Sequence, residues 1–142
     1  MKTKKPKVLF VASEAMPLVK TGGLADVAGS LPISLRTLGV DVAVMIPKHH
    51  VIKEKYESQI ETIAVTEIIL GWRRMYLGIQ RMDVGGISYY LLDNEDYFGD
   101  AIYRGGNAEN EQYLFFCRAV LESLEFLDFK PDILHCNDWH TG

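Results

Sequence analysis

The sequence is poor in cysteine, in long apolar runs and in surplus positive charge. Two cysteines among 142 residues are too few for a disulfide framework, which predicts a protein of the reducing cytoplasm. The longest uninterrupted apolar stretches, residues 8–12 and 68–72, have about five residues each, so we expect no membrane-spanning segment. Fifteen basic and nineteen acidic side chains give a net charge of −4, which argues against nucleic acid as a partner.

The residues that are present fit one globular unit. Hydrophobic residues make up 48% and charged residues 24% of the chain, which is typical of a folded protein and argues against disorder. A chain of 142 residues has the length of one domain and can bury a sizeable core.

Strand and helix patterns alternate in the first third of the chain. The apolar run 8–12 predicts a strand covered on both faces, and residues 40–46 predict a second strand. Between them we expect a helix over about residues 23–38, which Pro32 kinks or divides in two, with Ser30 capping the second part. This βαβ unit implies two parallel strands with a right-handed crossover. The apolar stripe predicted to face the sheet consists of Leu24, Val27, Leu31, Leu35 and Leu38.

The middle of the chain has a different pattern. Residues 60–70, 74–84 and 87–92 are rich in β-branched and aromatic side chains with partial alternation. Gly85-Gly86 separates the last two segments with the length and composition of a tight hairpin turn. We therefore expect an antiparallel insertion here.

The last third returns to a helix and a strand. A polar loop over 93–106 precedes a helix over 108–127, with Asn107 as its cap, and a final strand over 132–136. The predicted buried stripe of this helix is Tyr113, Phe116, Val120, Leu124 and Leu127. The fold class is therefore α/β, with a Rossmann-like, mostly parallel sheet and an antiparallel hairpin insertion. Because residues 137–142 carry helix-starting residue types with no helix after them, we expect the chain to be a fragment of a larger protein.

One candidate binding site follows the first strand. Gly22 and Gly23 let the backbone approach a ligand closely at a helix start, and Lys20 adds a positive charge beside them, which suits a phosphate or diphosphate. The spacing matches neither G-x-G-x-x-G nor G-x-x-x-x-G-K-[ST]. The alternative is a glycine-rich turn with a solvated lysine.

A second candidate site, Asp138-Trp139-His140, follows the last strand. If that strand is parallel to the first, both sites lie at the same carboxyl edge of the sheet, where open α/β sheets bind ligands. The alternatives are a helix cap for Asp138 and a surface position for His140. A zinc site at His135, Cys136 and His140 is disfavoured, because alternation places the first two on opposite faces of the strand. Phe98 and its aromatic neighbours in the loop 93–106 either stack on a sugar or fill an edge of the core.

These motifs resemble the bacterial glycogen synthase and plant starch synthase family. Residues 11–14 and 17–27 are similar to the amino-terminal signature of that family, residues 135–142 to its second motif, and residues 92–98 to the stretch between them. The resemblance covers essentially the whole chain. It implies a retaining glycosyltransferase of the two-domain GT-B architecture that transfers glucose from ADP-glucose to the non-reducing end of an α-1,4-glucan, with no metal or other cofactor.

The resemblance also implies roles for individual residues. Lys20 would contact the diphosphate, and Gly22 and Gly23 would approach it through backbone amides. Glu14 and Asp26 would line the sugar pocket.

Asp138 and His140 would be the catalytic residues facing the cleft between donor and acceptor. Residues 1–142 would form only part of an amino-terminal domain, inactive without the rest of that domain and the carboxyl-terminal domain. Two other interpretations remain open: a non-catalytic nucleotide- or phosphate-binding α/β domain, and an interaction domain in which both motifs are structural.

Overall fold

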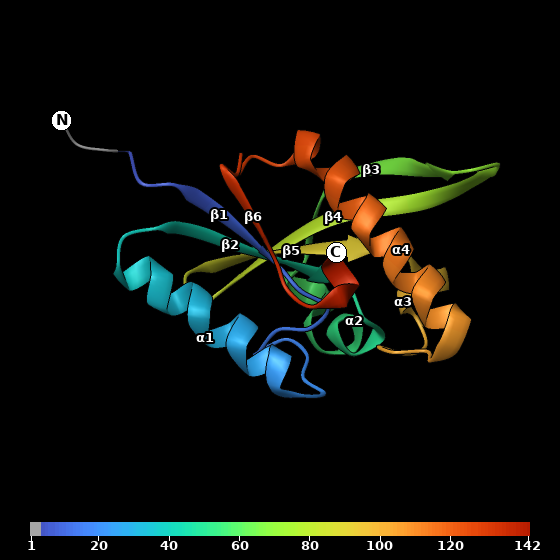
Figure 1. Cartoon of the computed structure of the whole chain (residues 1–142), viewed down its shortest axis with the longest axis horizontal. Coiled ribbons are helices and arrows are strands. Elements are labelled where there is room, and N and C mark those ends of the chain that lie inside the picture. The colour runs from blue at the N-terminus through green and yellow to red at the C-terminus, as the bar shows by residue number, and fades with distance from the viewer. Residues whose placement is uncertain (1–3) are drawn as a thin grey trace.

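The computed structural model describes residues 4–142 and contains one six-stranded sheet in the order β3-β4-β5-β2-β1-β6 (Figure 1). The strands are β1 (Lys7–Val11), β2 (Asp41–Pro47), β3 (Glu61–Leu70), β4 (Arg73–Val84), β5 (Ile87–Asp93) and β6 (Ile133–Cys136). The helices are α1 (Gly23–Thr37), α2 (His50–Tyr56), α3 (Glu95–Phe98) and α4 (Gly106–Ser123), with short 3₁₀ turns η1 (Glu57–Gln59), η2 (Leu124–Phe126) and η3 (Trp139–Thr141).

The sheet is mostly parallel, as predicted. Strand β1 lies between β2 and β6 and pairs with both in parallel, and β2 pairs in parallel with β5. Strands β3 and β4 extend the sheet in antiparallel fashion from β5. The predicted βαβ unit and antiparallel insertion are both confirmed. Gly85 and Gly86 form the turn between β4 and β5 with φ values of 58° and 77°, a left-handed conformation that favours glycine.

Two apolar layers cover the two faces of the sheet. Because side chains alternate along a strand, Leu9 and Val11 of β1 pack on the side of α4, whereas Val8 and Phe10 pack on the side of α1. Figure 1 shows α1 running beside β1 and β2, and α4 crossing the sheet nearer β4 and β5. Burial on both faces explains why the central strands are continuous apolar runs.

Helix α1 differs from its prediction in continuity. It is one helix that contains Pro32, and Ser30 does not cap a second helix. The hydroxyl of Ser30 instead donates a hydrogen bond to the carbonyl of Asp26, one turn earlier, at 2.7 Å. Pro32 is buried, so its packing offsets the missing backbone donor.

The buried face of α1 agrees only in part with the predicted stripe. Its buried residues are Ala25, Ala28 and Pro32, whereas Val27 and Leu38 are exposed. Small residues face inward because the helix lies very close to the segment after β1, where the amide of Met16 donates to the carbonyl of Ala25 at 3.0 Å. Close approach of the two backbones leaves no room for larger side chains at this contact. Later in the helix, Leu31 and Leu35 of the predicted stripe are partly buried and pack against the apolar layer on this side of the sheet.

Helix α4 begins at Gly106, two residues earlier than predicted. Its N-cap is Gly105, with φ at 79°, and Asn107 lies inside the first turn, so the predicted cap is wrong. The left-handed conformation at Gly105 turns the chain into the helix, and its amide donates to the carboxylate of Glu109 at 2.7 Å. The predicted stripe is buried at Tyr113, Phe116, Val120 and Leu127 and half-buried at Leu124.

The loop before α4 contains the short helix α3. Phe98 is fully buried there and packs against Phe115 and Phe116, with ring centroids 6.0 and 6.3 Å away. Phe98 therefore fills an edge of the core and offers no surface to a sugar. In the part of the chain that the structure describes, no helix is both long and apolar enough to cross a membrane.

Candidate functional site

The two sequence motifs meet at one edge of the sheet. Val11 at the end of β1 pairs with Cys136 at the end of β6, so the segments that follow both strands leave the same carboxyl edge. Asn137 joins them, because its backbone amide and its side-chain amide both donate to the carbonyl of Val11, at 3.1 and 2.9 Å. The predicted convergence of the two loops is confirmed.

Glu14 organises the glycine-containing loop from inside. Its side chain is buried, with 1% of the residue exposed. The carboxylate accepts hydrogen bonds from the amides of Thr21, Gly22 and Ala25 at 3.0, 3.1 and 3.2 Å, and from the hydroxyl of Thr21. A carboxylate is favoured at this place because the first turn of α1 presents unpaired amides and the positive end of the helix dipole. Glu14 thus holds the loop in shape through all of these donors.

Lys20 and Asp26 face solvent on the outer side of the same loop. The ammonium group of Lys20 lies 2.7 and 2.8 Å from the two carboxylate oxygens of Asp26, and both side chains are about half exposed. Exposed ion pairs contribute little net stability, so an anionic ligand can compete for the ammonium group. Gly23 is the first residue of α1, and a Cβ built on it would meet nothing within 4 Å. The amide of Gly22 donates to Glu14, which leaves Lys20 and the open backbone at Gly23 as the accessible groups.

Asp138 has an unusual backbone conformation at the end of β6. Its φ of 65° with ψ of 176° is the one positive φ at a non-glycine residue among residues 4–142. The carboxylate accepts a hydrogen bond from the amide of Trp139 at 2.7 Å and is otherwise exposed. Non-glycine residues in such conformations are strained and concentrate at functional sites. Asp138 caps η3 and at the same time presents a carboxylate at the sheet edge.

His140 is buried, in contrast to the surface position considered for it. Only 7% of the residue is exposed, and its ring lies 5.1, 4.7 and 4.1 Å from the rings of Tyr103, Tyr113 and Trp139. Burial lowers the pKa of His140, while the charge of Asp138 acts in the opposite direction to a smaller extent. The imidazole is therefore neutral at pH 7.

Tyr103 connects the two motifs. Its hydroxyl is hydrogen-bonded to the hydroxyl of Ser13 at 2.8 Å, next to Glu14, and its ring lies beside that of His140 with the two planes tilted by 38°. Burial raises the pKa of Tyr103, so the phenol keeps its proton at neutral pH. Tyr103 comes from the loop before α4, and nothing in the sequence except an aromatic residue in a glycine-containing loop indicated this position.

A profile of the starch synthase catalytic domain matches residues 7–142, almost the whole chain. The chain belongs to the glycogen and starch synthase family. It is 51% identical over 137 residues to a glycogen synthase of Anoxybacillus flavithermus and 52% identical over 137 residues to one of Clostridium kluyveri. Each alignment covers 96% of this chain but only 28% and 29% of the relative, so the chain spans little more than a quarter of their length.

A solved structure of the same family has the same fold. The catalytic domain of starch synthase IV from Arabidopsis thaliana, bound to ADP and acarbose, superposes with a TM-score of 0.84 at 28% identity. The match covers 97% of this chain and 29% of that one. The sheet order and the antiparallel part of the sheet therefore represent a glycogen and starch synthase architecture.

A buried histidine supports the first motif from a neighbouring strand. His49 follows β2 at the same edge and is fully buried, and its Nε2–H donates to the carbonyl of Ser13 at 2.8 Å. Its Nδ1 has no hydrogen-bond partner in the described part of the chain, and burial lowers the pKa of His49 to about 4. The sequence showed only that two histidines follow a strand end, which was not enough to predict this contact.

No group of three or more histidine, cysteine, aspartate or glutamate side chains is arranged to hold a metal ion within residues 4–142. The ring of His135 packs against Phe10 with centroids 4.6 Å apart, whereas Cys136 is exposed. Cys117 lies in α4, and its thiol donates to the carbonyl of His140 at 3.3 Å. Burial raises the pKa of Cys117, so this thiol serves packing and hydrogen bonding.

Proposed function

We propose that this chain is the amino-terminal part of a glycogen or starch synthase. In this proposal the parent enzyme has the two-domain GT-B architecture and transfers glucose from ADP-glucose to the non-reducing end of an α-1,4-glucan with retention of configuration. One observation carries the proposal: the segment with Lys20 and the segment with Asp138 leave the sheet at the same edge, because they follow the neighbouring parallel strands β1 and β6. Support comes from the glycogen synthases among the relatives and from the plant starch synthase bound to ADP and acarbose.

The donor diphosphate would bind outside the glycine-containing loop. Lys20 would exchange its carboxylate partner Asp26 for the diphosphate, and the amide at Gly23 would add the positive end of α1. Gly22 would contribute by having no side chain, since its amide is held by Glu14. Asp26, once released from Lys20, would accept hydrogen bonds from hydroxyl groups of the sugar.

The chemical step breaks the bond between the anomeric carbon of glucose and the diphosphate oxygen. The electron pair leaves with the diphosphate, and the sugar carbon becomes oxocarbenium-like, as in glycoside hydrolysis. A 4-hydroxyl of the glucan forms the new bond on the same face and gives its proton to the departing phosphate oxygen. Lys20 would stabilise the charge on the leaving group, and Asp138 would stabilise the positive carbon or orient sugar hydroxyls. His140, neutral at pH 7, would accept or donate a hydrogen bond to a sugar hydroxyl.

The chain by itself should have no transferase activity. The resemblance implies that the second domain of the enzyme supplies further basic residues and an acidic residue to the same cleft. The 142-residue chain would therefore bind the donor weakly without transferring glucose. Detectable elongation of a glucan by the purified chain would contradict this proposal.

Calorimetric titration with ADP-glucose, ADP and inorganic phosphate tests the donor site. We expect Lys20→Ala to weaken ADP-glucose binding about tenfold, the equivalent of about 1.4 kcal/mol, while the fold stays intact. Lys130→Ala is the matched control, because Lys130 is an exposed lysine that precedes β6 and so lies at the amino ends of the parallel strands, away from Lys20. Asp26→Asn should strengthen ADP binding, because it frees Lys20, and should reduce the preference for ADP-glucose over ADP.

The alternative function makes a different prediction in the same titration. A non-catalytic phosphate-binding domain would respond equally to phosphate, ADP and ADP-glucose. Equal affinities for all three would favour that alternative, in which Lys20 and the two glycines also hold the phosphate. An unchanged affinity in Lys20→Ala would contradict the phosphate-binding role of Lys20 in both functions.

A further inference from the structure

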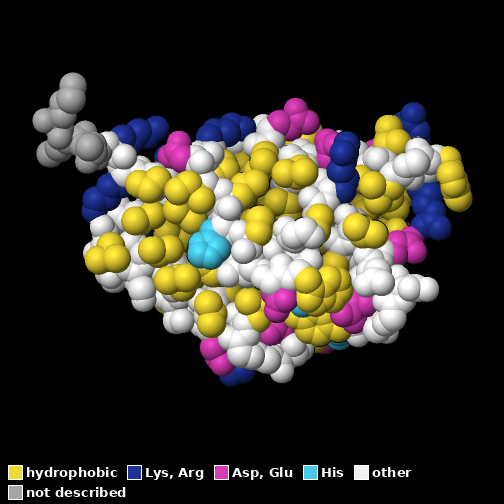
Figure 2. All heavy atoms as spheres, viewed as in Figure 1, with side chains coloured by type: hydrophobic (Ala, Val, Ile, Leu, Met, Phe, Trp, Pro, Cys, Tyr) yellow, Lys and Arg dark blue, Asp and Glu magenta, His cyan; other side chains and the backbone are white. Residues whose placement is uncertain are grey.

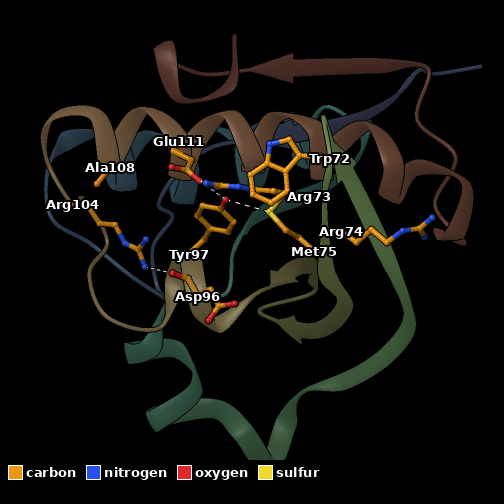
Figure 3. Close-up of a pocket in the computed structure, with 9 residues that line it drawn as sticks. All are labelled: Trp72, Arg73, Arg74, Met75, Asp96, Tyr97, Arg104, Ala108 and Glu111. Atoms are coloured by element: carbon orange, nitrogen blue, oxygen red, sulfur yellow. Dashed lines mark hydrogen bonds and ion pairs between the residues drawn. The ribbon is translucent and has the colours of Figure 1, made fainter.

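A hollow lies at the far end of the antiparallel part of the sheet, apart from the candidate site. It has a volume of about 540 Å³ and lies between the turn joining β3 to β4, helix α3 and the first turns of α4 (Figure 3). Strand β5 ends at Asp93 opposite Gly78 of β4, so β4 extends five residues past that pairing to Arg73. The β3–β4 turn therefore projects about 16 Å beyond the end of β5.

Trp72 in this turn is the most exposed of the large hydrophobic side chains among residues 4–142, at 87%. The guanidinium carbon of Arg73 lies 5.4 Å from the centre of its indole ring. Figure 3 shows the indole beside the hollow near Arg73 and Met75, whereas Arg74 points away from the other side chains. A flat aromatic face is thus offered to solvent at the border of a hollow.

The polar groups of the hollow are already held in place. The hydroxyl of Tyr97 donates to the carboxylate of Glu111 at 2.8 Å, and Arg73 pairs with the same carboxylate. The ring of Tyr97 is fixed from behind by stacking on Phe115, with centroids 4.5 Å apart. Fixed donors and acceptors reduce the ordering cost of binding a ligand.

The guanidinium groups that line the hollow are paired with carboxylates of the protein. Arg104 pairs with Asp100 at 2.8 Å and also donates to the carbonyl of Asp96, and Arg73 is paired with Glu111. An anionic ligand would have to displace these carboxylates. A neutral ligand rich in hydroxyl groups can instead accept from the guanidinium groups and donate to the carboxylates without breaking the pairs. The apolar face of a sugar ring in such a ligand can pack on Trp72, because the indole has a large apolar surface together with a polar N–H group.

We propose that this hollow, which we call the Trp72 hollow, is a second carbohydrate-binding site that holds a glucan chain away from the edge where β1 and β6 end. The inference deepens the proposed function, and it rests on that function for its choice of glucan as the carbohydrate. Trp72 packs on one sugar ring, and Arg73 and Glu111 bond its hydroxyl groups.

A neighbouring hollow links the Trp72 hollow to the sheet edge. It has a volume of about 830 Å³, shares Asp96 and Arg104 with the first, and reaches Lys48 and Asp93 at the carboxyl ends of β2 and β5. Strand β4 is three strands away from β1, a distance of about 14 Å across the sheet. A polymer that is bound at Trp72 can therefore run along these polar hollows toward the edge with Lys20 and Asp138, and the Trp72 hollow keeps it attached between transfers.

The two tryptophans allow each site to be observed separately. Trp72 lies in the hollow and Trp139 lies beside Asp138, so their two indole N–H signals in a nitrogen–proton correlation spectrum report one site each. Titration of the 142-residue chain with maltoheptaose should shift the Trp72 indole signal and the backbone signals of Arg73 and Tyr97 in a saturable way. We expect a dissociation constant of about 1 mM.

Substitutions make the test specific. Trp72→Ala should weaken maltoheptaose binding at the hollow at least fivefold, read from the signals of Arg73 and Tyr97. Ile69→Ala is the matched control, because Ile69 is an exposed apolar residue of the same hairpin that does not line the hollow. Melting curves of both variants should match that of the unaltered chain, since both side chains are exposed.

Three results would overturn the inference: no shift at Trp72 with maltoheptaose, equal binding by Trp72→Ala, or the same shifts caused by inorganic phosphate or ADP, which would indicate an anion site. Failure of the proposed function gives a different pattern. In that case ADP-glucose fails to shift the amides around Lys20 and the Trp139 indole, whatever maltoheptaose does at Trp72.

Discussion

A single buried carboxylate organises the loop that carries the proposed donor site. The resemblance implies a place for Glu14 along the sugar pocket, yet its oxygens accept hydrogen bonds from three backbone amides at the start of α1. These hydrogen bonds give Glu14 a structural role. They fix the backbone on either side of Gly23 and next to Lys20, and so position both residues. The contact of Glu14 with substrate stays a prediction.

Removal of this carboxylate should destabilise the chain. We expect Glu14→Ala to lower the free energy of unfolding by about 3 kcal/mol, because it leaves buried amide donors without acceptors. Glu14→Gln, which keeps one acceptor oxygen, should lose less. Urea unfolding at pH 7 measures both, with Glu54→Ala on the exposed face of α2 as the control. A loss in Glu14→Ala no larger than in that control would contradict the assigned role.

His49 should make the stability of the chain depend on pH. Its pKa is lowered from the ordinary 6.5 to about 4 by burial, so between these values the unfolded chain takes up a proton that the folded chain excludes. The contribution of His49 to the free energy of unfolding is therefore fully present above pH 6.5. It is lost as the pH is lowered toward 4, which reduces the free energy of unfolding by about 3 kcal/mol in total.

The variant His49→Gln separates this contribution from others. Glutamine keeps a donor for the carbonyl of Ser13 but does not titrate, so urea unfolding between pH 7 and pH 4 should show a much smaller slope. Burial also lowers the pKa of His140, which accounts for part of the remaining slope. An identical slope in His49→Gln and the unaltered chain would show that His49 is not the titrating group.

At the scale of elements, the packing of α1 depends on a glycine that the periodic pattern did not reveal. A Cβ on Gly29 would lie 2.8 Å from the Cβ and 2.9 Å from the carbonyl oxygen of Met16, closer than such atoms approach. Helix and loop would have to separate, and the buried face of α1 would lose contact with the sheet. This closeness explains why Ala25 and Ala28, and none of the larger residues of the predicted stripe, are the fully buried residues at this contact.

Two glycine substitutions in the same helix should have opposite effects. Gly29→Ala should lower the free energy of unfolding by about 1–3 kcal/mol, in spite of the higher helix propensity of alanine. Gly23→Ala meets no atom within 4 Å and has an ordinary φ, so it should leave stability unchanged or raise it by up to about 1 kcal/mol. Thermal melting compares them directly, and a stabilising Gly29→Ala would refute the close packing.

At the scale of the whole molecule, the two edges of the sheet are unlike. The edge strand β3 carries charged and polar side chains, among them Glu61, Thr66 and Glu67, which discourage pairing with another chain. The other edge strand, β6, reads Ile-Leu-His-Cys without a charged residue, and Ile133 is 48% exposed. Figure 2 shows hydrophobic side chains gathered over the face that carries β6.

The uncharged edge should cause self-association of the 142-residue chain. We expect sedimentation velocity to show dimers or larger species as the concentration rises, because an apolar edge strand offers unpaired backbone groups to a second copy. Ile133→Lys should reduce association several-fold. Ile33→Lys, at an exposed apolar site on α1, is the matched control and should not. Equal association of all three proteins would rule out β6 as the contact.

Local patterns in the sequence were sufficient for much of the architecture. The apolar runs of the central strands, the glycine pair of the β4–β5 turn and the crossover through α1 each depend on residues close together in the chain, and all are confirmed. The convergence of the Lys20 and Asp138 loops also followed, because parallel neighbouring strands must end at one edge. The presence of the family motifs is likewise a property of the sequence alone.

Contacts between distant segments could be decided only by the tertiary structure. The amides that Glu14 holds, the carbonyl of Ser13 that His49 reaches and the ring of Tyr103 beside His140 involve partners that no local pattern specifies. The same holds for the burial of His140 and for the face of α1 that packs inward. Hydrophobic periodicity determines which elements form, whereas the depth of each side chain and the partner of each polar group depend on how closely those elements pack.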